Sequence, residues 1–457
     1  MIPFKIRISQ DRWDSLKKIV PAAVLWTMLW GGYNTGIERM FNPEFPESYS
    51  DLFHGLRALL PCLAGYLALM ILLKKQSMPK LFARGPIGFL LLYAFIGIIS
   101  SLIFSNHPGM AIYWAGQYGS VILVLMAIMS NSDAEDRLSR LISLNWVFVT
   151  LVMVSLLVAL MFLKDVALVQ AEYSPLSVRA YASNYAHKGQ MLGMAATRNT
   201  GFGRYAAIAA LIALAHLWQG KNWSRVLWGL IFSLSLYSLI LSQARTEILS
   251  FVAAGFILLW LRKTPRPLFI ASALIAFIFL GLAGFYQGFW NYLFRGDSFD
   301  PTLTGRTETW KGGLTLIRES LLLGLGFHAD RIFMDGQHMH NTLLHALIQS
   351  GVIGTLFLVA AFIKVYKILV RFHQAKRSLP VHSLHAEIPA VIVFFTIASL
   401  TESTVAFFGA AWLIVAPLVA YLQAWDHNRK SELSYLNYVN RQGREQFNPD
   451  SFSIKRS

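Results

Sequence analysis

Long apolar stretches separated by short polar segments dominate the chain. About 20 helical residues cross the roughly 30 Å of hydrocarbon in a lipid bilayer, so apolar stretches of about 17–25 residues predict membrane spans. Open sheets would leave backbone groups unsatisfied in lipid, which predicts that the spans are helices. Twelve spans are predicted, at residues 17–33, 55–73, 86–105, 109–129, 141–163, 199–218, 224–243, 246–261, 268–288, 342–366, 387–403 and 405–424.

The composition agrees with a membrane protein. Of the 457 residues, 55% are hydrophobic and 14% are charged, whereas a typical soluble domain has about 25% charged residues. A water-soluble enzyme, a disordered protein and a secreted disulfide scaffold are therefore excluded, and the single cysteine, Cys62, cannot form an internal disulfide. The predicted fold is all-α: a polytopic transmembrane bundle of about twelve helices, with a long outer loop that carries short amphipathic helices.

The distribution of Lys and Arg predicts the orientation of the bundle. The chain has a formal net charge of +16, and basic residues concentrate in alternate connections, as they do in loops retained in the cytoplasm. These connections are 74–84, 221–225, 262–266 and 364–377. Topology thus accounts for most of the excess charge, and no nucleic-acid partner is expected. The acidic segment 34–54 falls on the outer side, and both termini are predicted to be cytoplasmic.

This orientation divides the chain into five parts. They are a cytoplasmic N-terminal segment (1–16), spans one to nine (17–288), an outer catalytic loop (289–341), spans ten to twelve (342–424) and a cytoplasmic tail (425–457). The tail is polar, which predicts that it is disordered or lies on a surface. Two outer connections, 164–198 and 289–341, are too long for simple turns, and loops of this length are usually functional.

The clearest motif for chemistry is His340-Asn341, followed by nine residues and Gly351-x-x-Gly354. If a helix begins near His340, residues 340, 344, 347, 351 and 354 share one of its faces. An imidazole then lies at the outer mouth of the helix, where its ordinary pKa near 6.5 suits it to accept a proton. The glycines would let a neighbouring helix approach closely. The simpler alternative is a loop histidine that only bonds to backbone.

A metal site is a further alternative for this motif. His338 and His340 form a His-x-His pair, and Asp330 and Asp335 lie close by in sequence, a set that could hold zinc. No cysteine or glutamate completes a familiar ligand spacing, so no metal is predicted.

Several arginines are predicted at the outer ends of spans. Arg245 lies in a tight outer turn, and Arg198 and Arg204 flank the outer end of a preceding span. A guanidinium in such a place offers a fork of donors that fits phosphate oxygens. The alternatives are an interfacial anchor or, for Arg245, an ion pair with Glu247.

An amphipathic stretch opens with Gly-Arg-Thr-Glu-Thr-Trp at residues 305–310. Arg306, Trp310, Gly313 and Ile317 fall on one face at helical spacing, which predicts a re-entrant or surface helix with a cation and an aromatic ring side by side. The Leu-Gly-Leu-Gly stretch at 323–326 supplies permissive backbone but lacks the Lys-Ser/Thr of a phosphate-binding P-loop.

These features together place arginines and one or two histidines on the outer face of a helical bundle. Arginines can neutralise a leaving pyrophosphate without a metal, and a histidine can remove the proton of an acceptor hydroxyl. The pattern predicts an anionic lipid-linked donor and a hydroxyl acceptor.

With these motifs the chain resembles the O-antigen ligase and O-antigen polymerase superfamily of bacterial membrane glycosyltransferases. The resemblance covers roughly residues 196–356 and rests on His340-Asn341-x9-Gly351-x-x-Gly354, Gly305-Arg306-x3-Trp310, Leu323-Gly324-x-Gly326 and the turn at Arg245. That turn reads Gln243-Ala244-Arg245, where the family often has serine before the arginine.

The resemblance implies transfer of a glycan from undecaprenyl pyrophosphate to a hydroxyl at the periplasmic face of the bacterial inner membrane. In the ligase branch the acceptor is a sugar of the lipid A core, the anomeric carbon is inverted, and neither a metal nor another cofactor takes part. His340 would be the base, and Arg245 and Arg306 would hold the pyrophosphate. The residues expected to bind substrate are His338, Asn341, Arg198, Arg204 and Trp310, and His338 is an alternative base.

Two other functions stay open at this point. A polymerase of the same superfamily would use a second lipid-linked repeat unit as acceptor. A polysaccharide transporter would place ionisable residues in mid-membrane and often shows duplicated halves. The predicted spans carry few charges and no internal repeat is evident, so transport is disfavoured and the ligase is the leading hypothesis.

Overall fold

The computed structural model describes residues 10–33, 49–75, 85–162, 199–217, 223–242, 244–261, 306–334, 338–375 and 384–446. Over these residues the regular structure is helical, without strands, as predicted. The helices are α1 (Gln10–Gly31), α2 (Tyr49–Lys74), α3 (Pro86–Phe104), α4 (Pro108–Met129), α5 (Ala134–Phe162), α8 (Asn199–Leu217), α9 (Trp223–Ser242), α10 (Arg245–Leu261), α13 (Arg306–Glu319), α14 (Ala329–Phe333), α15 (Thr342–Ala375), α16 (Leu384–Ala398) and α17 (Ala410–Gln446).

Seven helices in the described part of the chain are long and apolar enough to cross a membrane: α2, α3, α4, α5, α8, α9 and α15. Shorter apolar helices occur at Ile19–Gly31 and Leu384–Ala398. Eleven of the twelve predicted stretches fall on helices, and the stretch 268–288 lies outside the described residues. The structure therefore supports a polytopic all-α bundle, while the count of twelve spans is not confirmed.

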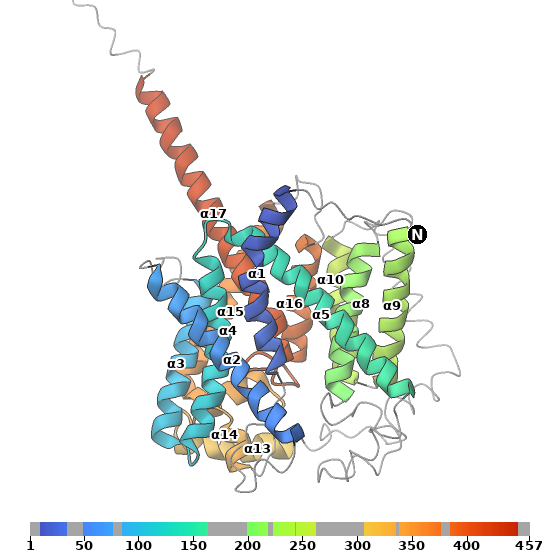
Figure 1. The fold of residues 1–457 in the computed structure, drawn as a ribbon. Helices are drawn as coiled ribbons and strands as arrows, with labels where there is room; N and C mark the ends of the chain where they lie inside the picture. The colour runs from blue at the N-terminus through green and yellow to red at the C-terminus, as the bar shows by residue number, and fades with distance from the viewer. Residues whose placement is uncertain are drawn as a thin grey trace, which may run out of the picture.

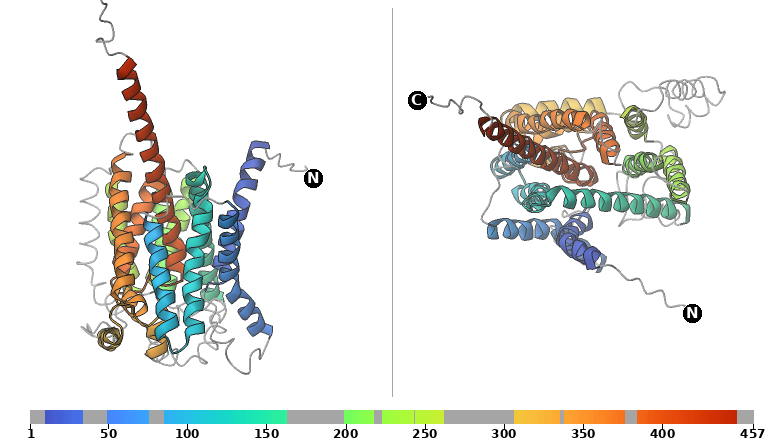
Figure 2. Two further views of the ribbon diagram at one scale, coloured as in Figure 1. Left: turned by 90° about the vertical axis from the view of Figure 1, so that its left-hand side faces the viewer. Right: turned by 90° about the horizontal axis from the view of Figure 1, so that it is seen from above.

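The helices stand side by side, with α5 strongly tilted across the bundle (Figures 1 and 2). Helix α4 is central, and its Tyr118 ring stacks on Trp412 of α17 with ring centroids 4.6 Å apart. Buried polar groups are paired within this core: Asn145 accepts hydrogen bonds from Trp26 and Trp30 and donates to the carbonyl of Leu413. Large apolar side chains on α2 and α9 remain exposed, as expected for helices that face lipid.

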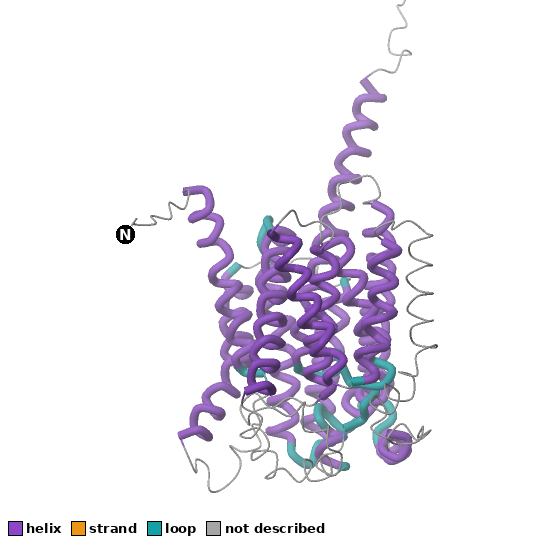
Figure 3. Tube along the Cα trace, turned by 90° about the vertical axis from the view of Figure 1, so that its right-hand side faces the viewer, coloured by secondary structure: helices purple, strands orange, loops and turns teal. Residues whose placement is uncertain are grey.

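The two short helices α13 and α14 lie at one end of the bundle, and α17 projects from the opposite end (Figure 1). Most of the described loops gather at the α13 and α14 end (Figure 3). The start of α15 and the end of α16 meet there, because the Thr342 amide donates to the carbonyl of Ser399 at 3.1 Å.

Helix α15 begins at Thr342, the first residue of the predicted span 342–366 and two residues after His340, but it is not continuous. It is broken at Gly351, whose φ of 58° and ψ of −166° are not helical. The amides of Val352 and Ile353 bond to the carbonyls of Leu321 and Leu322 instead of to the preceding helical turn. Residues 342–350 thus form a separate half-helix, and Gly351 makes the break rather than a smooth helix face.

The last two predicted spans also change. Residues 399–409 are not helical, although the predicted spans 387–403 and 405–424 cover most of them. This connection carries a polar run, Thr401-Glu402-Ser403-Thr404, whose groups bond to the start of α15. Helix α17 then continues to Gln446. The tail was predicted to be disordered or to lie on a surface, and the first of these alternatives was wrong up to Gln446. The segment contains many strong helix formers such as Lys, Arg, Glu and Leu.

Candidate functional site

The loop that ends at His340 is held in an unusual backbone conformation. His340 has a φ of 46°, in the left-handed region that few non-glycine residues adopt. The next residue, Asn341, caps α15: its side-chain oxygen accepts the amides of Leu343 and Leu344, both at 3.0 Å. Its side-chain nitrogen, Nδ2, donates to the carbonyl of Leu400 at 2.9 Å. Asn341, predicted to bind substrate, thus has a structural task.

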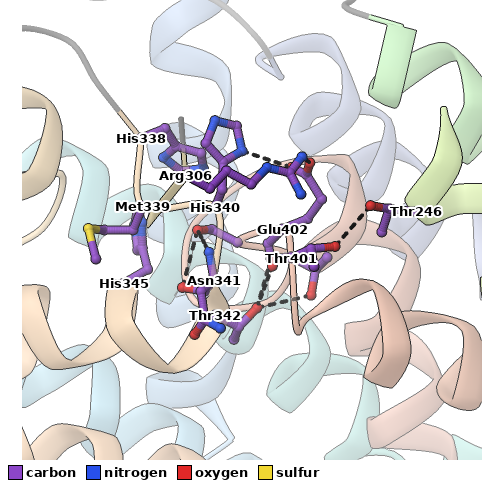
Figure 4. A network of polar contacts seen from close by, with 12 residues as sticks. Thr246, Arg306, His338, Met339, His340, Asn341, Thr342, His345, Thr401 and Glu402 are labelled. Carbon is purple, nitrogen blue, oxygen red and sulfur yellow. Dashed lines mark hydrogen bonds and ion pairs between the residues drawn. The ribbon is translucent and has the colours of Figure 1, made fainter. Parts of the chain in front are cut away.

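The polar connection after α16 is tied to this loop by several hydrogen bonds (Figure 4). The Thr342 hydroxyl donates to the carbonyl of Glu402 at 3.0 Å and accepts the amide of Thr404 at 3.0 Å. The backbone amide of Asn341 donates to the Ser403 hydroxyl at 3.3 Å. These bonds fix Glu402 beside His340, although the two residues are 62 positions apart.

Glu402 is the centre of the site. One carboxylate oxygen accepts a hydrogen bond from the Arg306 guanidinium at 2.8 Å, and the other lies 3.4 Å from Nδ1 of His340 (Figure 4). Burial alone would raise the pKa of the Glu402 carboxyl, but His340 and the arginines Arg204 and Arg306 lower it to about 2. Glu402 is therefore ionised at neutral pH and orients both the imidazole and the guanidinium.

A second ion pair lies next to the first. Arg204 of α8 contacts Glu247 of α10 at 3.4 Å, and the Glu247 side chain is completely buried. The neighbouring Thr246 forms a hydrogen bond of 2.9 Å with Thr401 (Figure 4), which brings the start of α10 to the Glu402 connection. Arg245 is the exposed first residue of α10. Arg198 lies outside the described residues.

Helix α13 carries Arg306 and Trp310 into the site, as the amphipathic pattern predicted. Gly313 and Ile317 are buried on the same helix. The indole nitrogen of Trp310 donates to the carbonyl of Met339 at 2.6 Å, so Trp310 holds the loop that carries His340.

His338 faces a different partner from His340. Its Nδ1 lies 3.0 Å from the carboxylate of Asp330, which also accepts the amide of Met339 at 3.1 Å. Burial would raise the pKa of Asp330, but His345 and His338 lower it well below its ordinary value. Burial also lowers the pKa of His338 to about 4, although the hydrogen bond with Asp330 opposes this. Asp330 is thus ionised and His338 neutral at pH 7.

The glycine-rich stretch at 323–326 packs against the break in α15. Gly324 and Gly326 have positive φ values, and a Cβ at Gly324 would lie 2.5 Å from the amide nitrogen of Gly351. The amides of Leu325 and Gly326 donate to the carbonyls of Ile348 and Gln349. These two amides serve the fold and do not form a phosphate cradle.

Residues 341–343 also border an apolar cavity of about 260 Å³. The rest of its wall comes from the second part of α15, from α16, from the connection after α16 and from α17. It includes Val359, Phe362 and Phe395. The polar site therefore adjoins an apolar space between helices.

Arg306, Trp310 and His340, all singled out from the sequence, lie together in the structure through Glu402 and the Met339 carbonyl. Glu402 and His345 were not among the residues expected from the sequence. One signal for Glu402 was available, because a carboxylate inside a predicted apolar span is costly unless it is paired. No sequence signal linked it to His340, since that contact joins distant segments.

The fold and this site define a polytopic membrane protein with a partly buried arginine–carboxylate–histidine cluster at one end of its helical bundle. Residues 230–359 match the family model for the O-antigen ligase, which confirms the resemblance predicted from the motifs. The matched region contains Arg245, Arg306 and His340 and ends before Glu402.

A second comparison agrees with the first. The chain is 29% identical over 233 residues to the exopolysaccharide production protein ExoQ of Rhizobium meliloti (strain 1021). This match covers 45% of the chain and 50% of that relative, so the chain spans about half the length of the protein it resembles.

Proposed function

We propose that this protein transfers a glycan from undecaprenyl pyrophosphate to a sugar hydroxyl of the lipid A core. The observation that carries the proposal is the contact of one ionised carboxylate, Glu402, with both Arg306 and His340. This places a proton acceptor and a cation close together, as transfer from a pyrophosphate donor requires. The O-antigen ligase match over residues 230–359 supports the same reaction.

The steps follow from the chemistry of these groups. Glu402 engages Nδ1 of His340, so Nε2 accepts the proton of the acceptor hydroxyl. The acceptor oxygen forms a bond to the anomeric carbon from the side opposite the pyrophosphate, and the anomeric configuration is inverted. The bond from that carbon to the pyrophosphate oxygen breaks, and its electron pair leaves with undecaprenyl pyrophosphate. Arg306, Arg245 and Arg204 stabilise the released charge, and no metal takes part in a step.

The apolar cavity beside Asn341 suits the lipid part of the donor. Its wall is almost entirely hydrophobic and it starts next to the His340 loop. An isoprenoid chain that enters it would leave its pyrophosphate beside Arg306. We place the site at the periplasmic face of the bacterial inner membrane, because the basic connections lie in the alternate set of loops.

A second candidate is polymerisation, in which another lipid-linked repeat unit is the acceptor. The similarity to an exopolysaccharide production protein favours it. The two reactions share the donor and the proposed roles of His340 and Arg306, and they differ only in the acceptor.

One assay tests the reaction and its acceptor. Purified protein receives a defined undecaprenyl-pyrophosphate glycan together with either lipid A core or a second donor molecule, with and without a chelator. We expect glycosylated lipid A core from the wild type and none from His340→Ala. If the only product were an elongated lipid-linked glycan, the protein would be a polymerase rather than a ligase. Full transfer by His340→Ala would refute the mechanism.

A further inference from the structure

Three side chains that the proposed reaction does not use converge next to the His340 loop. They are Asp330 of α14, His338 of the loop and His345 of the half-helix. Nδ1 of each histidine lies 3.0 Å from the same carboxylate oxygen of Asp330. Asp330 and His345 are completely buried and His338 is 12% exposed. One ligand atom from each residue lies within 4.8 Å of the other two.

The hydrogen bonds around Asp330 are unevenly distributed. Oδ2 accepts the Met339 amide and faces both histidines, whereas Oδ1 is buried without a partner among the described residues. The buried Oδ1 atom therefore needs a further partner, because a polar atom buried without one is costly.

Nε2 of His345 contacts the side-chain amide of Gln349, and the orientation of that amide can be deduced from Tyr93. Its hydroxyl lies 2.9 Å from Oε1 of Gln349 and 2.7 Å from the carbonyl of Ala406. A phenol has one proton and can donate only once. Both contacts are satisfied if Tyr93 donates to Ala406 and accepts from the amide nitrogen of Gln349, that is, with the oxygen and nitrogen of the Gln349 amide interchanged.

This assignment determines which nitrogen of His345 is free. The oxygen of Gln349 then faces Nε2 of His345, so Nε2 carries a proton. The other nitrogen, Nδ1, lies 3.0 Å from the Asp330 carboxylate oxygen, and no described residue meets hydrogen-bond angles with it. Nδ1 is thus the atom of His345 that can contact a ligand shared with Asp330 and His338.

We propose that Asp330, His338 and His345 bind a divalent transition-metal ion, and that zinc is the ion their donor set fits. Two imidazole nitrogens and a carboxylate oxygen are common zinc ligands, at about 2.0–2.2 Å from the metal. In a tetrahedral site the ligand atoms are then about 3.3 Å apart, close to the 3.0 Å contacts observed. A water molecule completes the coordination.

The role of this ion is structural. It ties α14 and the half-helix of α15 to the segment that contains Met339, whose carbonyl accepts the Trp310 indole. It therefore holds the backbone of the His340 loop and is not a participant in group transfer. With the Gln349 amide turned as described above, its oxygen accepts the Nε2 proton of His345. Groups that hydrogen-bond to the metal-ligating histidines in this way orient them at zinc sites.

Zinc content of the purified full-length protein tests the proposal without any activity measurement. The protein in detergent is incubated with zinc sulfate, desalted and analysed by elemental mass spectrometry. We expect about one zinc ion per chain in the wild type and in His107→Gln, a control that removes an exposed histidine at the start of α4. His338→Ala and His345→Gln should lose it. Zinc should also raise the Tm of the wild type and not that of His338→Ala.

Two results would overturn the site. The wild type could retain no zinc after loading, which would leave Asp330, His338 and His345 as a metal-free polar cluster. Alternatively, the wild type and His338→Ala could bind equal amounts, which would make the zinc adventitious. Because the wild type alone decides the first result, a poorly folding variant does not prevent the test. Zinc binding and glycan transfer are measured separately, so failure of either inference is distinguishable from failure of the other.

Discussion

Glu402 contacts the proposed base and one of the proposed phosphate-binding groups at the same time. Its pKa is lowered from 4.5 to about 2. A depressed carboxyl pKa means that the folded state favours the ionised form. The resulting stabilisation of the folded state is complete above about pH 4.5 and is lost as the pH falls towards 2. The two contacts therefore persist throughout the neutral range, and Glu402 behaves as a constant negative charge.

The substitution Glu402→Gln tests this role at the scale of one residue. The amide keeps the size of the side chain but cannot hold the imidazole and the guanidinium with a full negative charge. We expect kcat for glycan transfer to fall roughly 10²-fold, with a smaller change in the KM of the donor. Transfer kinetics with a defined lipid-linked donor give both constants.

The matched control is Glu308→Gln, which makes the same chemical change on the exposed side of α13. It should retain wild-type kinetics. Equal rates for Glu402→Gln and the wild type would remove Glu402 from the site.

The break in α15 is the feature that matters most at the scale of an element. The half-helix 342–350 carries His345 and is capped by Asn341, and the chain turns at Gly351. The stretch 321–326 supplies hydrogen bonds on both sides of the break. The half-helix that follows the His340 loop therefore ends at a glycine whose φ of 58° interrupts the helix.

Gly351→Ala should therefore destabilise the protein. A Cβ at Gly351 would lie 2.3 Å from the carbonyl carbon of Leu322, and the φ of 58° disfavours any side chain. We expect a loss of roughly 3 kcal/mol, measured as a lower Tm in detergent. Gly116→Ala in α4 is the control, because nothing lies within 4 Å of a Cβ there. It should leave the Tm unchanged or raise it slightly; a Tm for Gly351→Ala as high as that of the control would contradict the account.

At the scale of the whole molecule, charged groups and apolar space are arranged side by side. The Glu402 cluster includes Arg306, the first residue of α13, and α13 lies with α14 at one end of the bundle (Figure 1). The apolar cavity begins at Asn341 and follows α15 and α16. An amphiphilic donor requires this arrangement, because its anionic and isoprenoid parts are joined.

Val359→Phe tests the cavity. A larger side chain in its wall should exclude part of the isoprenoid chain and raise the KM of the donor roughly tenfold, with kcat at saturation changed less. Leu356→Phe places the same ring at a position 62% exposed on α15 and should have no effect. If the two variants had the same donor KM, the cavity would not be the lipid site.

Most of the fold could be predicted from the sequence, because a helix that crosses lipid must be apolar over about 20 residues, and such stretches are visible in the sequence. The apolar runs located α2 to α5 and α8 to α10, and the spacing of Arg306 and Trp310 identified α13. The break at Gly351 could not be predicted in this way, since a glycine within an apolar run is also compatible with a continuous helix.

The candidate site was only half predictable. His340 and Arg306 lie in local motifs, whereas Glu402 reaches them through hydrogen bonds between segments about 60 positions apart. His345 was hidden for a related reason: it lies inside α15, and its contact with Asp330 depends on how α14 folds back. Long-range pairing of this kind leaves no periodic signal in a single chain.

The hydrogen bonds between the His340 loop and the Glu402 connection have a consequence for exchanging parts between related transferases. A chimaera that replaced only α9 to α15 would bring in a foreign histidine loop and keep the resident carboxylate. The new loop would then meet a partner with which it had not coevolved. Residues 338–345 and 399–404 should therefore be transplanted together, as one discontinuous cassette.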